Sequence, residues 1–281
     1  MVGENTLGNR MLKLWVPLVL YAAFLLFPFA WMLIVSLKPD ELLLDTRRNP
    51  FAVINPTLEN YRRLIFESPF PRWILNTFVV TIGATLISLA CSILIGYALG
   101  RFRFRGGNTI GVLIFLLYLV PPTLLFIPLS QIVSGFGLYN QYAALILTYP
   151  TFLIPFASWL LMGYFRTISR ELEDAALVDG ATRIQAMWRV VLPLALPGVL
   201  SAAIFCFTLG WNEFLYALVF MGSGEMKTVP VGVVSDFIRA DVHFWGLLMA
   251  AGIAGSVPVA AAYAFLVDNY VSGLTAGATK G

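Results

Sequence analysis

Between Arg105 and Arg166 the sequence runs for 60 residues without a single charged side chain. Shorter uncharged runs of 24, 28 and 23 residues separate Lys13 from Lys38, Arg72 from Arg101, and Arg189 from Glu213. About 20 apolar residues in a helix are enough to cross the hydrocarbon layer of a membrane. A water-soluble domain carries about 25% charged residues, but this chain of 281 residues carries 12%. A soluble enzyme is therefore excluded, and the chain is expected in a membrane.

The 60-residue run is too long for one helix, and the glycine and asparagine residues between positions 134 and 141 predict a turn that divides it. We therefore expect an all-α integral membrane protein, with a single transmembrane domain over residues 1–281. The six predicted spans cover about residues 13–37, 73–100, 108–134, 142–165, 192–221 and 245–267. The first run is longer than the apolar core of a signal peptide, about 7–15 residues, so we predict a permanent helix there.

The distribution of Lys and Arg predicts the orientation, because short cytoplasmic loops are enriched in these residues. With the N-terminus inside, ten basic residues fall in cytoplasmic segments and eight in outer segments. This difference is small, but the short loops are clearer. Residues 101–105 contain three arginines, whereas residues 135–141 contain none. We therefore place both termini in the cytoplasm.

Charge and composition also limit the partners and cofactors. The net charge of +3 is too small to indicate a nucleic-acid partner. One histidine and two cysteines leave no cluster for a metal ion, and we expect neither a metal nor a cofactor in this chain. Residues 222–228 come nearest to a phosphate-binding loop, but they lack the glycine that precedes the lysine in that motif. No catalytic residues are assigned, and ATP hydrolysis is not expected here.

The loop between the fourth and fifth predicted spans, residues 166–190, combines small, apolar and acidic residues. Ser169 is placed to cap a helix with an acidic first turn, and Gly180 is placed to end it. Small residues permit the close approach of a partner, and acids offer charge-assisted hydrogen bonds to a basic surface. The candidate docking residues are Glu171, Glu173, Asp174, Ala175, Ala176, Asp179, Gly180 and Ala181. A plain amphipathic linker on the membrane is the alternative, and the residues alone leave both interpretations open.

The same loop resembles a known family. Residues 171–181, followed by Leu192-Pro193 and Pro197, are similar to the loop with the EAA motif in permease subunits of binding-protein-dependent ABC importers. Residues 58–61, 72–77 and 210–214 resemble the carbohydrate branch of that family, in which the G-type subunits of maltose transporters are the most similar. One departure is that Asp174 stands where the family usually has a glutamate, so its reach to a basic partner is one methylene shorter.

This resemblance implies a type I ABC importer permease, in which residues 166–190 form a cytoplasmic coupling helix. It implies a second permease subunit in a heterodimer, two ATPase subunits that bind ATP and Mg²⁺, and a periplasmic or lipid-anchored sugar-binding protein. The complex would lie among the lipids of a bacterial or archaeal cytoplasmic membrane and import an oligosaccharide, glycoside or sugar derivative. A self-contained secondary transporter or channel is the alternative, which predicts inverted repeats and activity without an ATPase.

Glu213 is the one acidic residue within a predicted span. Ionisable groups at membrane depth usually face the helix bundle or a cavity. With Trp211, Asn212 and Tyr216 it forms a candidate sugar path, in which aromatic rings stack on sugars and polar groups bind hydroxyls. The alternative is a hydrogen bond that fixes helix packing, or a position near the outer interface. In the second span, Gly96 and Gly100 have a spacing of small residues that predicts close helix packing.

Overall fold

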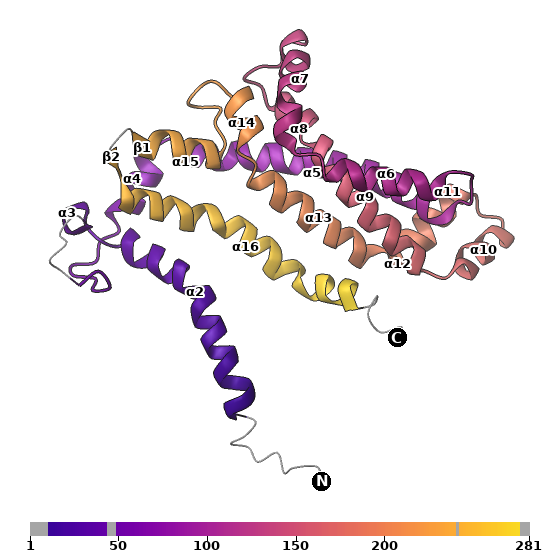
Figure 1. The fold of residues 1–281 in the computed structure, drawn as a ribbon, viewed down its shortest axis with the longest axis horizontal. Coiled ribbons are helices and arrows are strands. Elements are labelled where there is room, and N and C mark those ends of the chain that lie inside the picture. Colours follow the sequence, from indigo (N-terminus) through magenta and orange to yellow (C-terminus); the bar gives the residue numbers. More distant parts are fainter. Residues whose placement is uncertain (1–10, 44–48, 240–241, 276–281) are drawn as a thin grey trace. The chain divides into compact units, whose positions relative to one another are not determined.

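The computed structural model describes residues 11–43, 49–239 and 242–275, and Figure 1 shows the helices of each part of the chain. Contacts divide the chain into two compact units: residues 1–71 with 233–256, and residues 72–232 with 257–281. The regular structure of the described residues is helical apart from two short strands. β1 (Ile238–Arg239) pairs antiparallel with β2 (Val242–His243).

The first unit begins with a π-helix (Met11–Trp15) that continues into α2 (Val16–Ser36), followed by α3 (Asp40–Leu43) and α4 (Glu59–Phe66). Asn60 of α4 fixes the end of α2, because its side-chain amide donates hydrogen bonds of 3.0 Å to the carbonyl oxygens of Ser36 and Lys38. The unit also contains the start of α16 (Trp245–Thr275). A Cβ at Gly246 of this helix would lie 2.5 Å from Nδ2 of Asn60, so only a glycine leaves room for the amide.

The second unit contains nearly all of α5 (Phe70–Arg101), which packs closely on α9 (Pro150–Thr167). Two glycines of α5 make this approach possible. A Cβ at Gly96 would lie 2.9 Å from Cβ of Leu161, and a Cβ at Gly100 would lie 3.1 Å from the carbonyl oxygen of Met162. The close packing predicted for the two glycines is therefore confirmed.

α9 also packs against α6 (Gly107–Tyr118) and α13 (Leu196–Trp211). This unit also contains α7 (Pro122–Gly135), α8 (Tyr142–Thr148), α14 (Leu215–Phe220) and the start of α15 (Val229–Phe237), within which the division between the two units falls. α14 packs against α7 and α8. The buried core includes large side chains from α8 to α14, among them Tyr149, Leu153, Leu161, Phe165, Tyr216 and Phe220.

Two of the apolar segments are bent. α6 and α7 meet at 90°, and residues 183–194 meet α13 at 78°. A new helix begins at Pro122, since proline has no N–H to continue the preceding helix and its ring disfavours helical geometry in the residue before it. The segment before α13 consists of α11 (Arg183–Ala186), a second π-helix (Met187–Val191) and α12 (Leu192–Leu194).

Four helical segments are long and apolar enough to cross a membrane: Lys13–Ser36, Phe70–Arg101, Tyr142–Thr167 and Trp245–Phe265. The number among the described residues rises to six when each bent pair forms one span. This architecture agrees with the expected all-helical membrane protein. The predicted third and fifth spans correspond to the two bent pairs. The adjacent prolines at positions 121 and 122 predict a kink in the third span, whereas the sequence did not predict the break in the fifth.

Candidate functional site

The candidate docking residues of the loop 166–190 lie on and directly after one helix, α10 (Arg170–Val178). The predicted N-cap is confirmed: Oγ of Ser169 accepts a hydrogen bond of 3.3 Å from the backbone N–H of Glu171. Glu171 and Glu173 occupy the first turn, where carboxylates interact favourably with the positive end of the helix dipole. The local sequence therefore determines where α10 begins.

α10 ends in a Schellman motif centred on Gly180. This residue has a φ of +87°, which glycine adopts without steric cost. Its N–H donates to the carbonyl oxygen of Leu177 at 3.1 Å, and the N–H of Ala181 donates to that of Ala176 at 3.0 Å. These bonds satisfy carbonyl groups that would otherwise lack partners at the helix end, and they reverse the direction of the chain.

The next helix, α11, begins with a capping box. Oγ1 of Thr182 accepts a hydrogen bond from the N–H of Gln185, whose side-chain oxygen in turn accepts one of 2.8 Å from the N–H of Thr182. α10 contacts both α11 and the π-helix Met187–Val191. The loop is therefore a folded helical unit, and Figure 1 shows α10 and α11 at one end of the second unit.

Glu173 faces inward and is bound by two side chains of α5. Its Oε2 lies 2.7 Å from Nε of Arg101, and its Oε1 accepts a hydrogen bond of 2.6 Å from the hydroxyl of Tyr97. Only 2% of the Arg101 side chain and 8% of the Glu173 side chain are exposed. Charge-assisted hydrogen bonds are strong, and a buried charge without its partner is costly. The pair therefore fastens α10 to the end of α5.

Arg101 also binds the segment that joins α9 to α10. Its Nη1 donates to the carbonyl oxygens of Ile168 at 2.7 Å and Phe165 at 3.3 Å, and its Nη2 donates to that of Ser169 at 3.2 Å. The last carbonyl groups of a helix have no partner within it, so the guanidinium satisfies the end of α9. One side chain thus connects α5, α9 and α10.

The other candidate docking residues remain at or near the surface. Glu171, Asp174, Ala175, Asp179 and Gly180 are exposed, while Ala176 and Ala181 are half-buried. Large apolar side chains are exposed in the same loop: Val178 by 87%, Ile184 by 69% and Trp188 by 56%. Exposed apolar groups surrounded by polar ones are typical of a surface that a partner covers.

The sequence did not reveal that Glu173 is buried while the neighbouring acids are exposed, nor that Arg101 and Tyr97 bind its carboxylate. Arg101 and Glu173 are 72 positions apart, and no local pattern connects them. Arg101 had been predicted only as part of the basic loop 101–105. The one available signal was its position as the last residue of α5, where a side chain can reach the adjoining loop.

Trp211 and Asn212, two of the four candidates for a sugar path, face different surroundings. Trp211 is only 3% exposed, stacks on Phe207 with ring centroids 5.5 Å apart, and meets Phe78 edge-on at 4.9 Å. Asn212 is exposed and forms the C-cap of α13, where its amide donates to the carbonyl oxygen of Thr208 at 2.8 Å. Of these two side chains, only Asn212 is open to solvent.

Glu213 and Tyr216 join α14 to its surroundings. Glu213 lies in the break after α13, and its carboxylate accepts hydrogen bonds from the N–H groups of Tyr216 at 2.8 Å and Ala217 at 3.1 Å. It thus caps α14. Tyr216 is fully buried and donates to the carbonyl oxygen of Pro122 at 3.1 Å. These contacts agree with the packing alternative, and a role in a sugar path stays a prediction.

Residues 222–228 form a loop between α14 and α15 that α5 holds in place. Nε1 of Trp73 donates to the carbonyl oxygen of Gly224 at 2.8 Å, and the amide of Asn76 donates to those of Glu225 and Lys227. A phosphate-binding loop presents its N–H groups to the ligand. Here the carbonyl groups of the loop are used to bind a membrane helix.

Residues 92–275 match the family model described as "Binding-protein-dependent transport system inner membrane component". This stretch contains the last part of α5, the whole loop 166–190 and all of α16. The Arg101–Glu173 pair and the outward surface of α10 therefore both lie within the matched region.

Two relatives extend the similarity to nearly the whole chain. The sulfoquinovosyl glycerol transport system permease protein SmoH of Agrobacterium fabrum is 37% identical over 91% of this chain and 89% of its own. The trehalose/maltose transport system permease protein MalG of Thermococcus litoralis is 34% identical over 94% of both chains. Among solved structures, a chain of a bacterial ABC transporter that imports the acidic polysaccharide alginate superimposes with a TM-score of 0.75. It is 21% identical and covers 94% of this chain and 98% of that one. The expected fold class is thereby confirmed.

Proposed function

We propose that this chain passes a sugar through the cytoplasmic membrane. The proposal starts from its family, because the chain belongs to the binding-protein-dependent transport system inner membrane components. It is the permease component of an ABC importer, and not the ATPase. Relatives are named for transport of sulfoquinovosyl glycerol, trehalose/maltose and diacetylchitobiose. All three names describe sugars or sugar derivatives, which supports an oligosaccharide, a glycoside or a sugar derivative as the cargo.

The proposed assembly places this chain beside a second, different permease subunit. Two ATPase subunits bind ATP and Mg²⁺ on the cytoplasmic side, where both termini of this chain also lie. A periplasmic or lipid-anchored binding protein delivers the sugar on the other side. Support for this last partner comes from the family description and from a structural neighbour. That neighbour is an alginate transporter in complex with a periplasmic protein, and it has a TM-score of 0.63 with this chain.

The observation that carries the mechanism is the division of α10 into an anchored and a free side. Glu173 is fixed to Arg101, while Asp174, Ala175 and Val178 remain exposed. We propose that the ATPase binds this exposed side of α10. Because Arg101 binds α5, α9 and α10 together, a movement of α10 on closure of the ATPase pair would reach two membrane helices directly.

The sugar path is assigned to the region of residues 211–216. Asn212 supplies an exposed polar group there, whereas the rings of Trp211 and Tyr216 are buried and would line the path only in a conformation that uncovers them. Glu213 holds the start of α14 in position rather than presenting a free carboxylate. The second permease would supply the facing wall of the path.

The coupling role is tested by purifying the tagged full-length chain from its own host in a mild detergent. The amount of ATPase subunit that accompanies it is measured by mass spectrometry. Asp174→Arg reverses a charge on the free side of α10, and Glu225→Arg reverses an exposed charge outside the loop. We expect the ATPase with the wild type and with Glu225→Arg, and a loss of tenfold or more with Asp174→Arg. Retention by Asp174→Arg, or no ATPase with the wild type, contradicts the assignment.

The cargo is tested separately by uptake of radiolabelled disaccharides and glycosides into cells that lack the gene. Uptake of one sugar class should disappear and return with the wild-type chain. Uptake that is unaffected for every sugar contradicts the carbohydrate assignment. Transport by the purified chain in vesicles without ATP would instead favour a self-contained secondary transporter or channel.

A further inference from the structure

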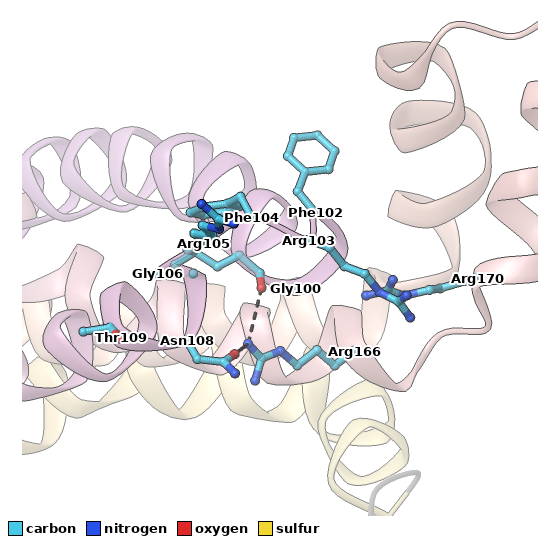
Figure 2. A pocket seen from close by; sticks show the side chains of 12 residues that line it. Gly100, Phe102, Arg103, Phe104, Arg105, Gly106, Asn108, Thr109, Arg166 and Arg170 are labelled. Atoms are coloured by element: carbon cyan, nitrogen blue, oxygen red, sulfur yellow. Dashed lines mark hydrogen bonds between the residues drawn. The ribbon is translucent and has the colours of Figure 1, made fainter.

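A groove of about 690 Å³ lies where the ends of α5, α6 and α9 come together (Figure 2). Its lining includes four arginines: Arg103, Arg105, Arg166 and Arg170. No aspartate or glutamate is among the lining residues. Four positive charges around one open space repel each other, so the groove is suited to an anion.

Three of these guanidinium groups have no partner among the described residues, although Arg103 and Arg170 also line a neighbouring pocket that contains Glu173 and Asp174. Arg103, Arg105 and Arg170 form neither an ion pair nor a hydrogen bond with the residues that the structure describes. Figure 2 shows the side chains of Arg103 and Arg170 directed toward one another. Arg166 is held differently, because its Nη2 donates to the carbonyl oxygen of Leu99 at 3.3 Å and to Oδ1 of Asn108 at 3.1 Å.

The backbone adds further positive potential to the groove. The twelve-residue helix α6 begins at Gly107, and both Gly107 and the two residues after it line the groove. The N–H groups of Asn108 and Thr109 have no backbone partner among the described residues. Free N–H groups at a helix start attract phosphate, so they reinforce what the arginines provide.

The position of the groove indicates where a phosphate would come from. It lies at the ends of helices that belong to candidate membrane spans, so we expect it near the level at which a bilayer changes from hydrocarbon to headgroups. Phe102 and Phe104 alternate with the arginines and are 40% and 45% exposed. Interfacial segments combine Lys or Arg with Trp, Phe or Leu, and basic pockets between membrane helices bind lipid headgroups.

We propose that this groove binds a phosphate group, supplied by the headgroup of an anionic phospholipid. Arg103 and Arg170 contact the phosphate from two sides, while the rings of Phe102 and Phe104 lie against the upper part of the acyl chains. Since Arg170 is the first residue of α10 and Arg166 lies near the end of α9, a bound headgroup connects the loop 102–106 to the start of α10. The proposal holds whatever solute is transported.

The test uses the complete transporter reconstituted in nanodiscs of phosphatidylcholine mixed with phosphatidylglycerol. Native mass spectrometry counts the phosphatidylglycerol molecules that remain bound to the released complex. The test variant is Arg103→Gln/Arg170→Gln. The matched control is Arg189→Gln, which removes an exposed arginine of the same loop that does not line the groove. Loss of two charges near a membrane surface should weaken binding about 20- to 30-fold, so the test variant loses one lipid that the wild type and the control retain.

A charge-preserving variant, Arg103→Lys/Arg170→Lys, separates binding from misfolding, because it should retain the lipid while changing the same side chains. A second arm titrates inorganic phosphate against the lipid-bound complex. If phosphate displaces phosphatidylglycerol only from the wild type and Arg189→Gln, the groove recognises phosphate itself; if it displaces none, the lipid is the ligand. Equal lipid retention by the wild type and the glutamine variant overturns the proposal. Release of the ATPase by that variant, with lipid retention unchanged, would identify the arginines as a protein contact instead.

Discussion

The inward and outward sides of α10 differ in burial, although an acidic residue occupies each of them. Glu173 and Asp174 are consecutive acids, yet the first is buried against Arg101 and the second is exposed. Because 3.6 residues complete a helical turn, a step of one position turns a side chain by about 100°. The comparison shows that one short helix can be fastened to the membrane helices by one acid while the next acid stays at the surface.

The largest expected effect comes from removing the partner of the inward acid. Arg101→Met leaves Glu173 buried without its counter-charge, which should lower the free energy of unfolding by about 3–5 kcal/mol. Thermal unfolding of the purified full-length chain in detergent measures this. Arg105→Met removes an exposed arginine four residues further on and should change stability by less than about 0.5 kcal/mol.

The double variant Arg101→Met/Glu173→Met sharpens the comparison. Apolar residues that replace both members of a buried pair often restore stability, so the double variant should unfold at a higher temperature than Arg101→Met alone. If Arg101→Met is as stable as the wild type, the pair does not fasten α10 as we infer.

A smaller effect on stability is expected at Gly180, which ends α10. Gly180→Ala places a Cβ at a φ of +87°, and the left-handed conformation costs an alanine about 1–2 kcal/mol. Gly163→Ala is the matched control within α9. Neither new Cβ would meet an atom within 4 Å, and Gly163 lies in a helix, where alanine gains roughly 0.5–1 kcal/mol over glycine. Opposite changes in the unfolding temperature are expected; equal changes would show that the conformation of Gly180 has no special role.

The smallest effect on stability is expected at the outward acid. Asp174→Asn removes a charge from an exposed position and should change the free energy of unfolding by less than about 0.5 kcal/mol. It should nevertheless lower ATP hydrolysis by the reconstituted complex in response to the loaded binding protein, whereas Asp174→Glu should preserve it. A large loss of stability in Asp174→Asn would mean that the two sides of α10 are not independent.

The sequence predicted the features that depend on neighbouring residues. Ser169 and Gly180 set the ends of α10 through local hydrogen bonds and backbone conformation, and the uncharged runs predicted the membrane helices. The pairing of Arg101 with Glu173 could not be predicted, since it exists only because α5 packs on α9. The prolines also predicted a bend before Pro122, but not its angle of 90°, because the angle depends on the helices packed around it.

The buried pair has a consequence for the order in which the chain is made. Arg101 and Glu173 are separated by 72 positions, so a ribosome adding about 5–20 residues per second needs about 4–14 seconds to pass from one to the other. During that interval α6, α7, α8 and α9 are synthesised, and α10 has no anchor until α5 and α9 have met in the membrane. A cytoplasmic subunit that recognises the anchored helix would therefore encounter its docking surface only on chains whose membrane helices have already assembled.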